Sequence, residues 1–159
     1  MRRRRAFGIL SKMEPRMPRM QCEVLVESIA TKLQSQATGR PPVVVIVDDD
    51  PAVCSSLKFS LELEGFAVQA YGNAAELLQA NDYAACDCFV IDQRMPGMTG
   101  MELIAKLREQ KVLTPAILII SHANSALRAR ASLADVPIVE KPLLGNALVD
   151  RIREACRRS

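Results

Sequence analysis

Residues 43–51, which read VVVIVDDDP, join a predicted buried strand to a predicted helix. The five β-branched residues from Val43 to Val47 are typical of a strand covered on both faces of a parallel sheet. Asp50 and Pro51 favour the start of a helix, because aspartate is a good N-cap and proline fits the first helical position. Gly65 is placed to end that helix. This segment therefore predicts a strand followed directly by a helix.

The same order of strand and helix repeats to the end of the chain. Further strands are predicted at residues 66–70, 88–91, 116–120 and 137–140. Further helices are predicted to begin at Asn73 and at Thr99, to run over 124–133, and to extend from about 144 towards 156. Five strand–helix units predict a parallel sheet with helices on both faces, since right-handed crossovers leave few other arrangements. A closed eight-fold barrel needs about 250 residues, so a doubly wound, five-stranded α/β fold is expected.

Charge divides the chain into two parts. Residues 1–40 carry nine Lys or Arg and three Glu, whereas residues 41–159 carry twelve Lys or Arg and fifteen Asp or Glu. We predict that residues 1–40 are a basic N-terminal extension, partly disordered or forming one helix over 21–37, and that residues 41–159 are the folded domain. A nucleic-acid or membrane arm is less favoured, because four arginines without interleaved aromatics make a weak binding footprint.

The apolar runs are too short for a membrane span or an export signal. The longest, Val43–Val47 and Ala116–Ile120, have five residues each, whereas a transmembrane helix needs about 20. The apolar stretch after the N-terminal arginines ends at Leu10, before an export signal would be complete. The five cysteines lack the spacing of a disulfide framework, which favours a reducing compartment. We therefore predict a cytoplasmic protein without membrane association.

Side chains that could carry chemistry follow four of the predicted strands. Asp48 and Asp49 follow the first strand, Asp92 the third, Ser121 the fourth and Lys141 the fifth. The carboxyl ends of the strands form the functional edge of such sheets, so these side chains are expected to converge. Two carboxylates 4 Å apart repel by about 4 kcal/mol at an effective dielectric of 20, and Mg²⁺ (or Mn²⁺) would relieve that repulsion.

Together with the metal, the lysine and the serine hydroxyl could hold a phosphoryl group on a carboxylate. The alternative is that acids after strands only cap helices. That interpretation fits Asp50, but it does not explain charged side chains at three separate strand ends.

Four stretches resemble the response-regulator receiver domain, the phosphoacceptor module of two-component signalling. They read VVVIVDDDP at 43–51, FVIDQRMPGMTGMEL at 89–103, ILIISH at 117–122 and VEKP at 139–142. The nitrogen-fixation-type regulators are the most similar in these motifs. The resemblance extends from residue 43 to about 156 and implies a flavodoxin-like fold with strand order 2-1-3-4-5.

The resemblance also implies which residues bind the phosphoryl group and the metal. Asp92 matches the phosphorylated aspartate, which also lies at the metal. Asp49 matches a direct Mg²⁺ ligand, and Asp48 matches the acid that usually reaches the metal through water. Arg94 stands where the third protein ligand is a backbone carbonyl.

Ser121 and Lys141 match the two side chains that contact the phosphoryl group, and the Lys141–Pro142 bond is implied to be cis. Ser121 is also the switch residue, and its partner position in the fifth strand is Ile138 rather than the frequent aromatic residue. We expect this aliphatic residue to weaken or alter the switch without preventing phosphorylation. Ala123 cannot orient a water molecule, which predicts slow self-dephosphorylation.

The expected function is that of a phosphorelay switch. A histidine kinase or phosphotransfer protein would phosphorylate Asp92, and binding of a downstream protein would change. Because the chain stops at Ser159, directly after the last predicted helix, a stand-alone receiver without a DNA-binding output domain is expected. No turnover of an external substrate and no direct nucleic-acid binding are expected; homodimerisation is left open. The alternative is a receiver-fold module that binds a kinase or phosphotransfer protein without being phosphorylated.

Overall fold

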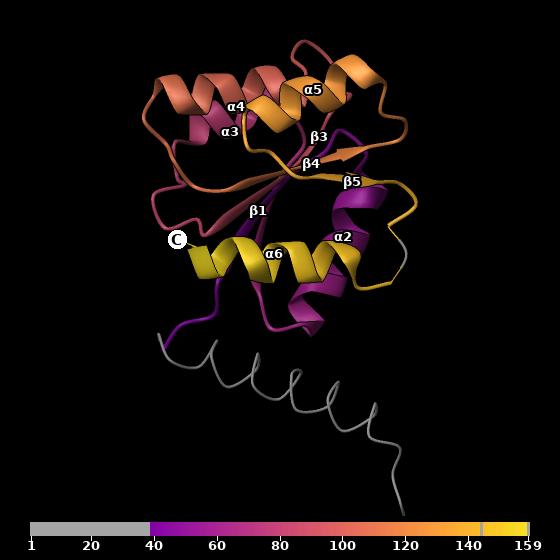
Figure 1. The fold of residues 1–159 in the computed structure, drawn as a ribbon. Helices are drawn as coiled ribbons and strands as arrows, with labels where there is room; N and C mark the ends of the chain where they lie inside the picture. Colours follow the sequence, from indigo (N-terminus) through magenta and orange to yellow (C-terminus); the bar gives the residue numbers. More distant parts are fainter. Residues whose placement is uncertain (1–38, 144, 159) are drawn as a thin grey trace, which may run out of the picture. The chain divides into compact units, whose positions relative to one another are not determined.

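The computed structural model describes residues 39–143 and 145–158, so the helix predicted over 21–37 lies outside the described residues. From Arg40 onward these residues form one compact unit. Strands and helices alternate along it (Figure 1). In chain order they are β1 (Val43–Val47), α2 (Pro51–Leu63), β2 (Ala67–Tyr71), α3 (Ala74–Ala80), β3 (Cys88–Asp92), α4 (Gly100–Glu109), β4 (Ala116–Ile120), α5 (Ser125–Leu133), β5 (Ile138–Glu140) and α6 (Ala147–Arg158).

The five strands form one parallel sheet in the order β2-β1-β3-β4-β5. Helices α3, α4 and α5 lie on one face of the sheet, and α2 and α6 lie on the other (Figure 1). The doubly wound, five-stranded fold and its predicted strand order are therefore confirmed.

Alternate strand residues pack into two separate cores, one on each face. Phe89 and Ile91 of β3 pack with Leu103 and Leu107 of α4. On the other face, Val90 packs with a cluster that includes Leu57, Leu61, Leu148 and Ile152 from α2 and α6. Residues 88–92 are all buried, as expected for a central strand with helices on both sides.

The junction between α2 and β2 lies one residue later than predicted. Gly65 has φ +91, and its N–H donates to the Glu62 carbonyl while the N–H of Phe66 donates to the Leu61 carbonyl, both at 3.1 Å. These two bonds make a Schellman cap. Phe66 therefore belongs to the helix cap, and β2 begins at Ala67.

The last helix also begins later than predicted, at Ala147. Gly145 has φ +71, a left-handed conformation that cannot belong to a right-handed helix. The N–H of Asp150 donates to the carbonyl of Asn146 at 2.8 Å, which gives the first turn its hydrogen bond. The turn at Gly145 thus sets the start of α6.

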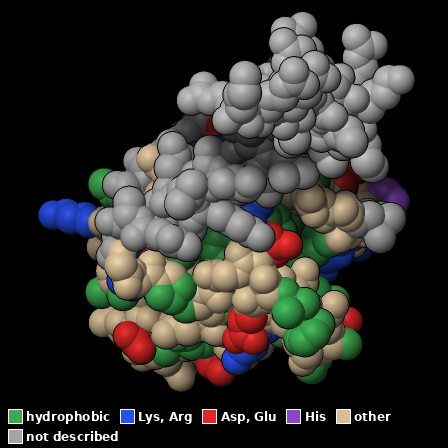
Figure 2. Space-filling model, turned by 90° about the horizontal axis from the view of Figure 1, so that it is seen from below, with side chains coloured by type: hydrophobic (Ala, Val, Ile, Leu, Met, Phe, Trp, Pro, Cys, Tyr) green, Lys and Arg blue, Asp and Glu red, His purple; other side chains and the backbone are tan. Residues whose placement is uncertain are grey.

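The visible surface is chemically mixed. Figure 2 shows one face, on which acidic and basic side chains are scattered among polar and apolar ones wherever the described residues are in view.

No helix in the described ranges is long and apolar enough to cross a bilayer. The thiols of Cys86 and Cys88 are buried, and burial raises the pKa of Cys86 to about 12, so this thiol stays protonated at neutral pH.

Candidate functional site

Two acidic side chains are buried at the carboxyl edge of the sheet. Asp92 is the last residue of β3, and Asp48 directly follows the neighbouring strand β1. Their exposed fractions are 5% and 2%. They are the only charged residues among the buried side chains of the described part of the chain. Because burying a carboxylate is costly without compensation, their environment must supply positive charge and hydrogen-bond donors.

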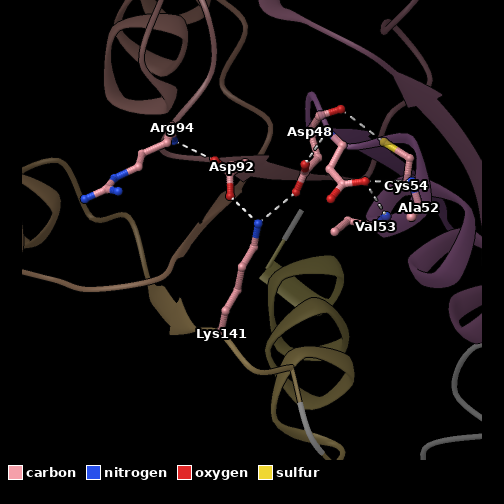
Figure 3. A network of polar contacts seen from close by, with 8 residues as sticks. Asp48, Ala52, Val53, Cys54, Asp92, Arg94 and Lys141 are labelled. Atoms are coloured by element: carbon pink, nitrogen blue, oxygen red, sulfur yellow. Dashed lines mark hydrogen bonds and ion pairs between the residues drawn. The ribbon is translucent and has the colours of Figure 1, made fainter.

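Lys141 supplies the positive charge. It directly follows β5, and its Nζ lies 2.6 Å from Asp92 Oδ1 and 3.1 Å from Asp48 Oδ2. Figure 3 shows the lysine reaching between the two acids from the β5 side. The other oxygen of each acid accepts a backbone N–H, from Asp50 at 2.9 Å for Asp48 and from Arg94 at 2.6 Å for Asp92. All four carboxylate oxygens therefore have a donor.

The protonation of Lys141 reflects opposing influences. Partial burial lowers its pKa, but the hydrogen bonds to Asp92 and Asp48, with the charges of both acids, outweigh burial and raise the pKa above its ordinary value. The side chain is therefore an ammonium at neutral pH. A fixed cation between two buried carboxylates is the central electrostatic feature of the site.

Asp48 is also held through its backbone. Its N–H donates to the Tyr71 carbonyl at 3.2 Å, and its carbonyl accepts the Cys54 thiol at 3.3 Å. Asp50, two residues later, caps α2 by accepting the N–H of Ala52 at 2.8 Å (Figure 3). The predicted helix start at Asp50 and Pro51 is confirmed, so the same loop fixes both α2 and Asp48.

The structure brings three of the predicted site residues into one network. Asp48, Asp92 and Lys141 are directly connected. Asp49 and Ser121 are exposed, and neither forms a side-chain hydrogen bond with these three in the described part of the chain. Ile138 is half-buried in β5, pairs in register with Leu118 of β4 and packs against the core under α4 and α5. The Lys141–Pro142 bond is cis, as the resemblance implied.

Two residues that sequence reasoning missed shape the loop after Asp92. A Cβ on Gly100 would lie 2.5 Å from the Asp92 carbonyl oxygen, so only glycine allows α4 to approach β3 this closely. The Gln93 side chain accepts the N–H of Met101 at 3.2 Å, and its backbone carbonyl accepts the N–H of Gly100 at 3.1 Å. A glycine directly after the Thr99 cap was the available signal for this contact.

The donor set fits a hard divalent cation. Asp48 and Asp92 supply buried carboxylate oxygens, and Lys141 balances only one of these two charges. Asp49, the next residue after Asp48, is an exposed carboxylate. Among the described residues, no three His, Cys, Asp or Glu side chains form a metal-binding group on their own. A backbone carbonyl, as predicted at Arg94, and water would have to complete the coordination. Mg²⁺ accepts this arrangement, because it usually keeps several waters and needs only one or two carboxylates.

The substitution Lys141→Met removes the cation of the site and tests its contribution to stability. Because two buried carboxylates would lose their shared cation, we expect the free energy of unfolding to fall by about 1–3 kcal/mol at pH 7. This expected loss is smaller than the loss for a fully buried ion pair, since Lys141 is partly exposed. Urea unfolding of the full chain measures the free energy of unfolding. Lys106→Met, on the exposed face of α4, is the matched control and should change little.

The pH dependence of this effect follows from the raised pKa of Lys141. A raised pKa in the folded state means that the stabilisation is fully present below the unfolded value near 10.5. It is lost only as the pH rises through the folded value. The difference between wild type and Lys141→Met should therefore stay constant from pH 7 to 9. A difference that vanishes within that window would contradict the assignment.

A five-stranded doubly wound sheet, with buried acids and a lysine at its carboxyl edge, defines a receiver-type α/β domain. Residues 44–153 match the response regulator receiver domain family, and the chain belongs to this family.

Similar proteins are consistent with this family assignment. The chain is 32% identical over 117 residues to the transcriptional regulatory protein FixJ of Bradyrhizobium diazoefficiens, covering 73% of this chain and 57% of FixJ. It therefore spans little more than half of that relative's length. A crystal structure of FixJ-N is similar with a TM-score of 0.68 and 33% identity, covering 76% of this chain and 97% of FixJ-N.

A second similar structure contains a metal. The response regulator protein TrrA of Thermotoga maritima, solved in complex with Mg²⁺-BeF, has a TM-score of 0.63 and 25% identity. It covers 72% of this chain and 98% of TrrA. The predicted similarity to nitrogen-fixation-type regulators is consistent with the FixJ match.

Proposed function

We propose that this receiver domain accepts a phosphoryl group on Asp92 from a histidine kinase or a phosphotransfer protein. The observation that carries the proposal is the Lys141 ammonium, held 2.6 Å from an oxygen of the buried Asp92. An Asp92 oxygen would attack phosphorus, and the bond from phosphorus to the donor's leaving nitrogen or oxygen would break with its electron pair going to the donor. Lys141 would then neutralise negative charge on the transferred group.

Asp48, Asp49, Asp92 and the backbone carbonyl of Arg94 would hold Mg²⁺ (or Mn²⁺). The ion would supply positive charge to the phosphoryl oxygens. Asp48 and Asp92 support this assignment by their burial and by the hydrogen bonds that fix their orientation. The solved TrrA complex with Mg²⁺-BeF supports it by family likeness.

Signal output would follow from Ser121 and Ile138. Ser121 directly follows β4, so its hydroxyl is available to a phosphoryl group at the same edge of the sheet. Ile138 lies on the adjacent strand β5, where a change at Ser121 could be passed to α5 through packing. The domain would catalyse only its own phosphorylation and its own slow dephosphorylation. It would not turn over an external substrate. The domain would bind partner proteins in the cytoplasm. It would not bind membranes or nucleic acids directly.

Intact mass spectrometry after incubation with acetyl phosphate and Mg²⁺ tests the proposal. We expect one phosphoryl adduct per chain, absent when EDTA replaces Mg²⁺. A correctly folded protein that gains no adduct from acetyl phosphate or from a phosphorylated phosphotransfer protein would favour the contact-only alternative. An adduct unaffected by EDTA would contradict the metal assignment.

A further inference from the structure

A second concave site lies beside the phosphoacceptor site, between the loop from β3 to α4 and the segment that enters and forms α5. It is a groove of about 590 Å³, within the 300–1,000 Å³ that ligand-binding clefts usually enclose. One wall is the loop from β3 to α4, including Arg94 and Met95, and the other includes His122, Leu127 and Arg130. The groove is thus built from the two segments that follow Asp92 and Ser121.

The rim of this groove is cationic. Arg94 and Arg130 are exposed on opposite walls, and His122, the chain's one histidine, is exposed on the same wall as Arg130. No acidic residue lines the groove. Residues 41–159 carry more acidic than basic side chains, so this local excess of positive charge runs against the charge of the domain as a whole.

The two arginines differ from most others in the described part of the chain. Arg40, Arg128, Arg151 and Arg153 each pair with a carboxylate, and Arg108 donates to backbone carbonyls. Within the described residues, no carboxylate pairs with the guanidinium of Arg94 or Arg130. Figure 3 shows the Arg94 side chain extending away from Asp92 and Lys141, so the phosphoacceptor site does not use its charge.

Glu102 attracts Arg130 but is held mainly by other contacts. Glu102 of α4 has a lowered pKa, mainly because its carboxylate accepts the backbone N–H and the hydroxyl of Thr99, and Arg130 contributes a smaller attraction. These two hydrogen bonds are 2.8 and 2.9 Å long and form part of the capping box of α4. Arg130 therefore remains available to an incoming anion.

Part of the groove lining is apolar, beside the polar side chains of Gln93, Thr99 and Asn124. Met95 is buried, and Leu127 is half-buried against the core beneath. Pro96 and Ala126 continue this apolar lining. Two cations and an apolar strip (Met95, Pro96, Ala126 and Leu127) that line one groove fit a peptide in which an apolar side chain lies next to carboxylates. A phosphate backbone would gain nothing from the apolar strip.

We propose that the groove between the β3–α4 loop and α5 binds a short acidic segment of a partner protein, with Arg94 and Arg130 pairing with its carboxylates and the apolar side chains of Met95 and Leu127 contacting its apolar side chain. This binding does not depend on phosphorylation, so the proposal can be tested independently of the proposed function. Its position also places the partner beside the phosphoacceptor site.

The test is an NMR titration of the unphosphorylated, ¹⁵N-labelled full chain with the capped peptide Gly-Glu-Leu-Glu-Gly. We expect shifts concentrated at the groove and an affinity at least about fivefold higher than for Gly-Gln-Leu-Gln-Gly, in the range of one or two exposed ion pairs. Arg130→Glu should remove this preference. Arg157→Glu, an equal charge change at an exposed position of α6 outside the groove, should retain it.

Three results would overturn the proposal. The first is equal binding of the acidic and amide peptides, and the second is an equal loss in both charge reversals. The third is a single-stranded DNA oligonucleotide that produces the same shifts with the same or higher affinity, which would make the groove a general anion patch. The backbone spectrum of each variant reports whether it has kept its fold.

Discussion

No phosphoryl adduct is expected on an Asp92→Asn variant incubated with acetyl phosphate and Mg²⁺. The amide of asparagine lacks the negative oxygen that attacks phosphorus, while its size and shape are those of aspartate. The loss should be complete within the sensitivity of intact mass spectrometry, because no other carboxylate in residues 39–143 and 145–158 combines the burial of Asp92 with an ammonium 2.6 Å away.

This loss should occur without unfolding. In Asp92→Asn the Lys141 ammonium still has Asp48 as a partner at 3.1 Å, so the site keeps one buried acid and one cation. Asp135→Asn is the matched control, since Asp135 is exposed and has φ 52, a conformation that asparagine tolerates. Asp135→Asn should gain the adduct as wild type does. A full adduct on Asp92→Asn would instead move the phosphorylated position to another acid, such as Asp49.

Local signals in the sequence predicted most of the fold. The cap at Asp50, the proline after it and the helix starts at Asn73 and Thr99 all occur as expected, because each depends on residues within one helical turn. Thr99 and Glu102 form a complete capping box, whereas the one at Asn73 forms only in part. Asn73 accepts the N–H of Glu76, but the Glu76 carboxylate accepts the N–H of Gly72. Which of two neighbouring N–H groups a side chain reaches depends on the entering loop, which the pattern does not encode.

The candidate site was predictable to the level of the sheet edge. Strand order and the residue after each strand bring Asp48, Asp92 and Lys141 together. The sequence could not show that Lys141 bridges both acids, since that depends on distances across three strands. Nor could it show the groove between the β3–α4 loop and α5, because Arg94 and Arg130 are 36 positions apart and line one groove only through the tertiary placement of this loop beside α5.

Gly100→Ala is expected to damage both the fold and the phosphoacceptor site. A Cβ at this position would lie 2.5 Å from the Asp92 carbonyl oxygen and 2.7 Å from Leu118 Cδ1. The first neighbour is backbone and cannot rotate away, so either α4 or the end of β3 must move. Overpacking a core usually costs about 1–3 kcal/mol, and a clash with backbone places the expected loss in the free energy of unfolding at about 3 kcal/mol or more.

Any displacement of the Asp92 backbone would also move its carboxylate relative to Lys141, so folded Gly100→Ala should react more slowly with acetyl phosphate.

Gly72→Ala is the matched control. The nearest atom to a Cβ there is the end of the flexible Glu76 side chain at 3.4 Å, and Gly72 has no positive φ. Its stability should change by less than about 1 kcal/mol, because alanine also reduces the entropy of the unfolded chain. Urea unfolding of both variants and the rate of adduct formation measure the two effects. Equal stability of the two variants would show that α4 can shift without cost and that the contact of Gly100 with Asp92 does not position the phosphoacceptor.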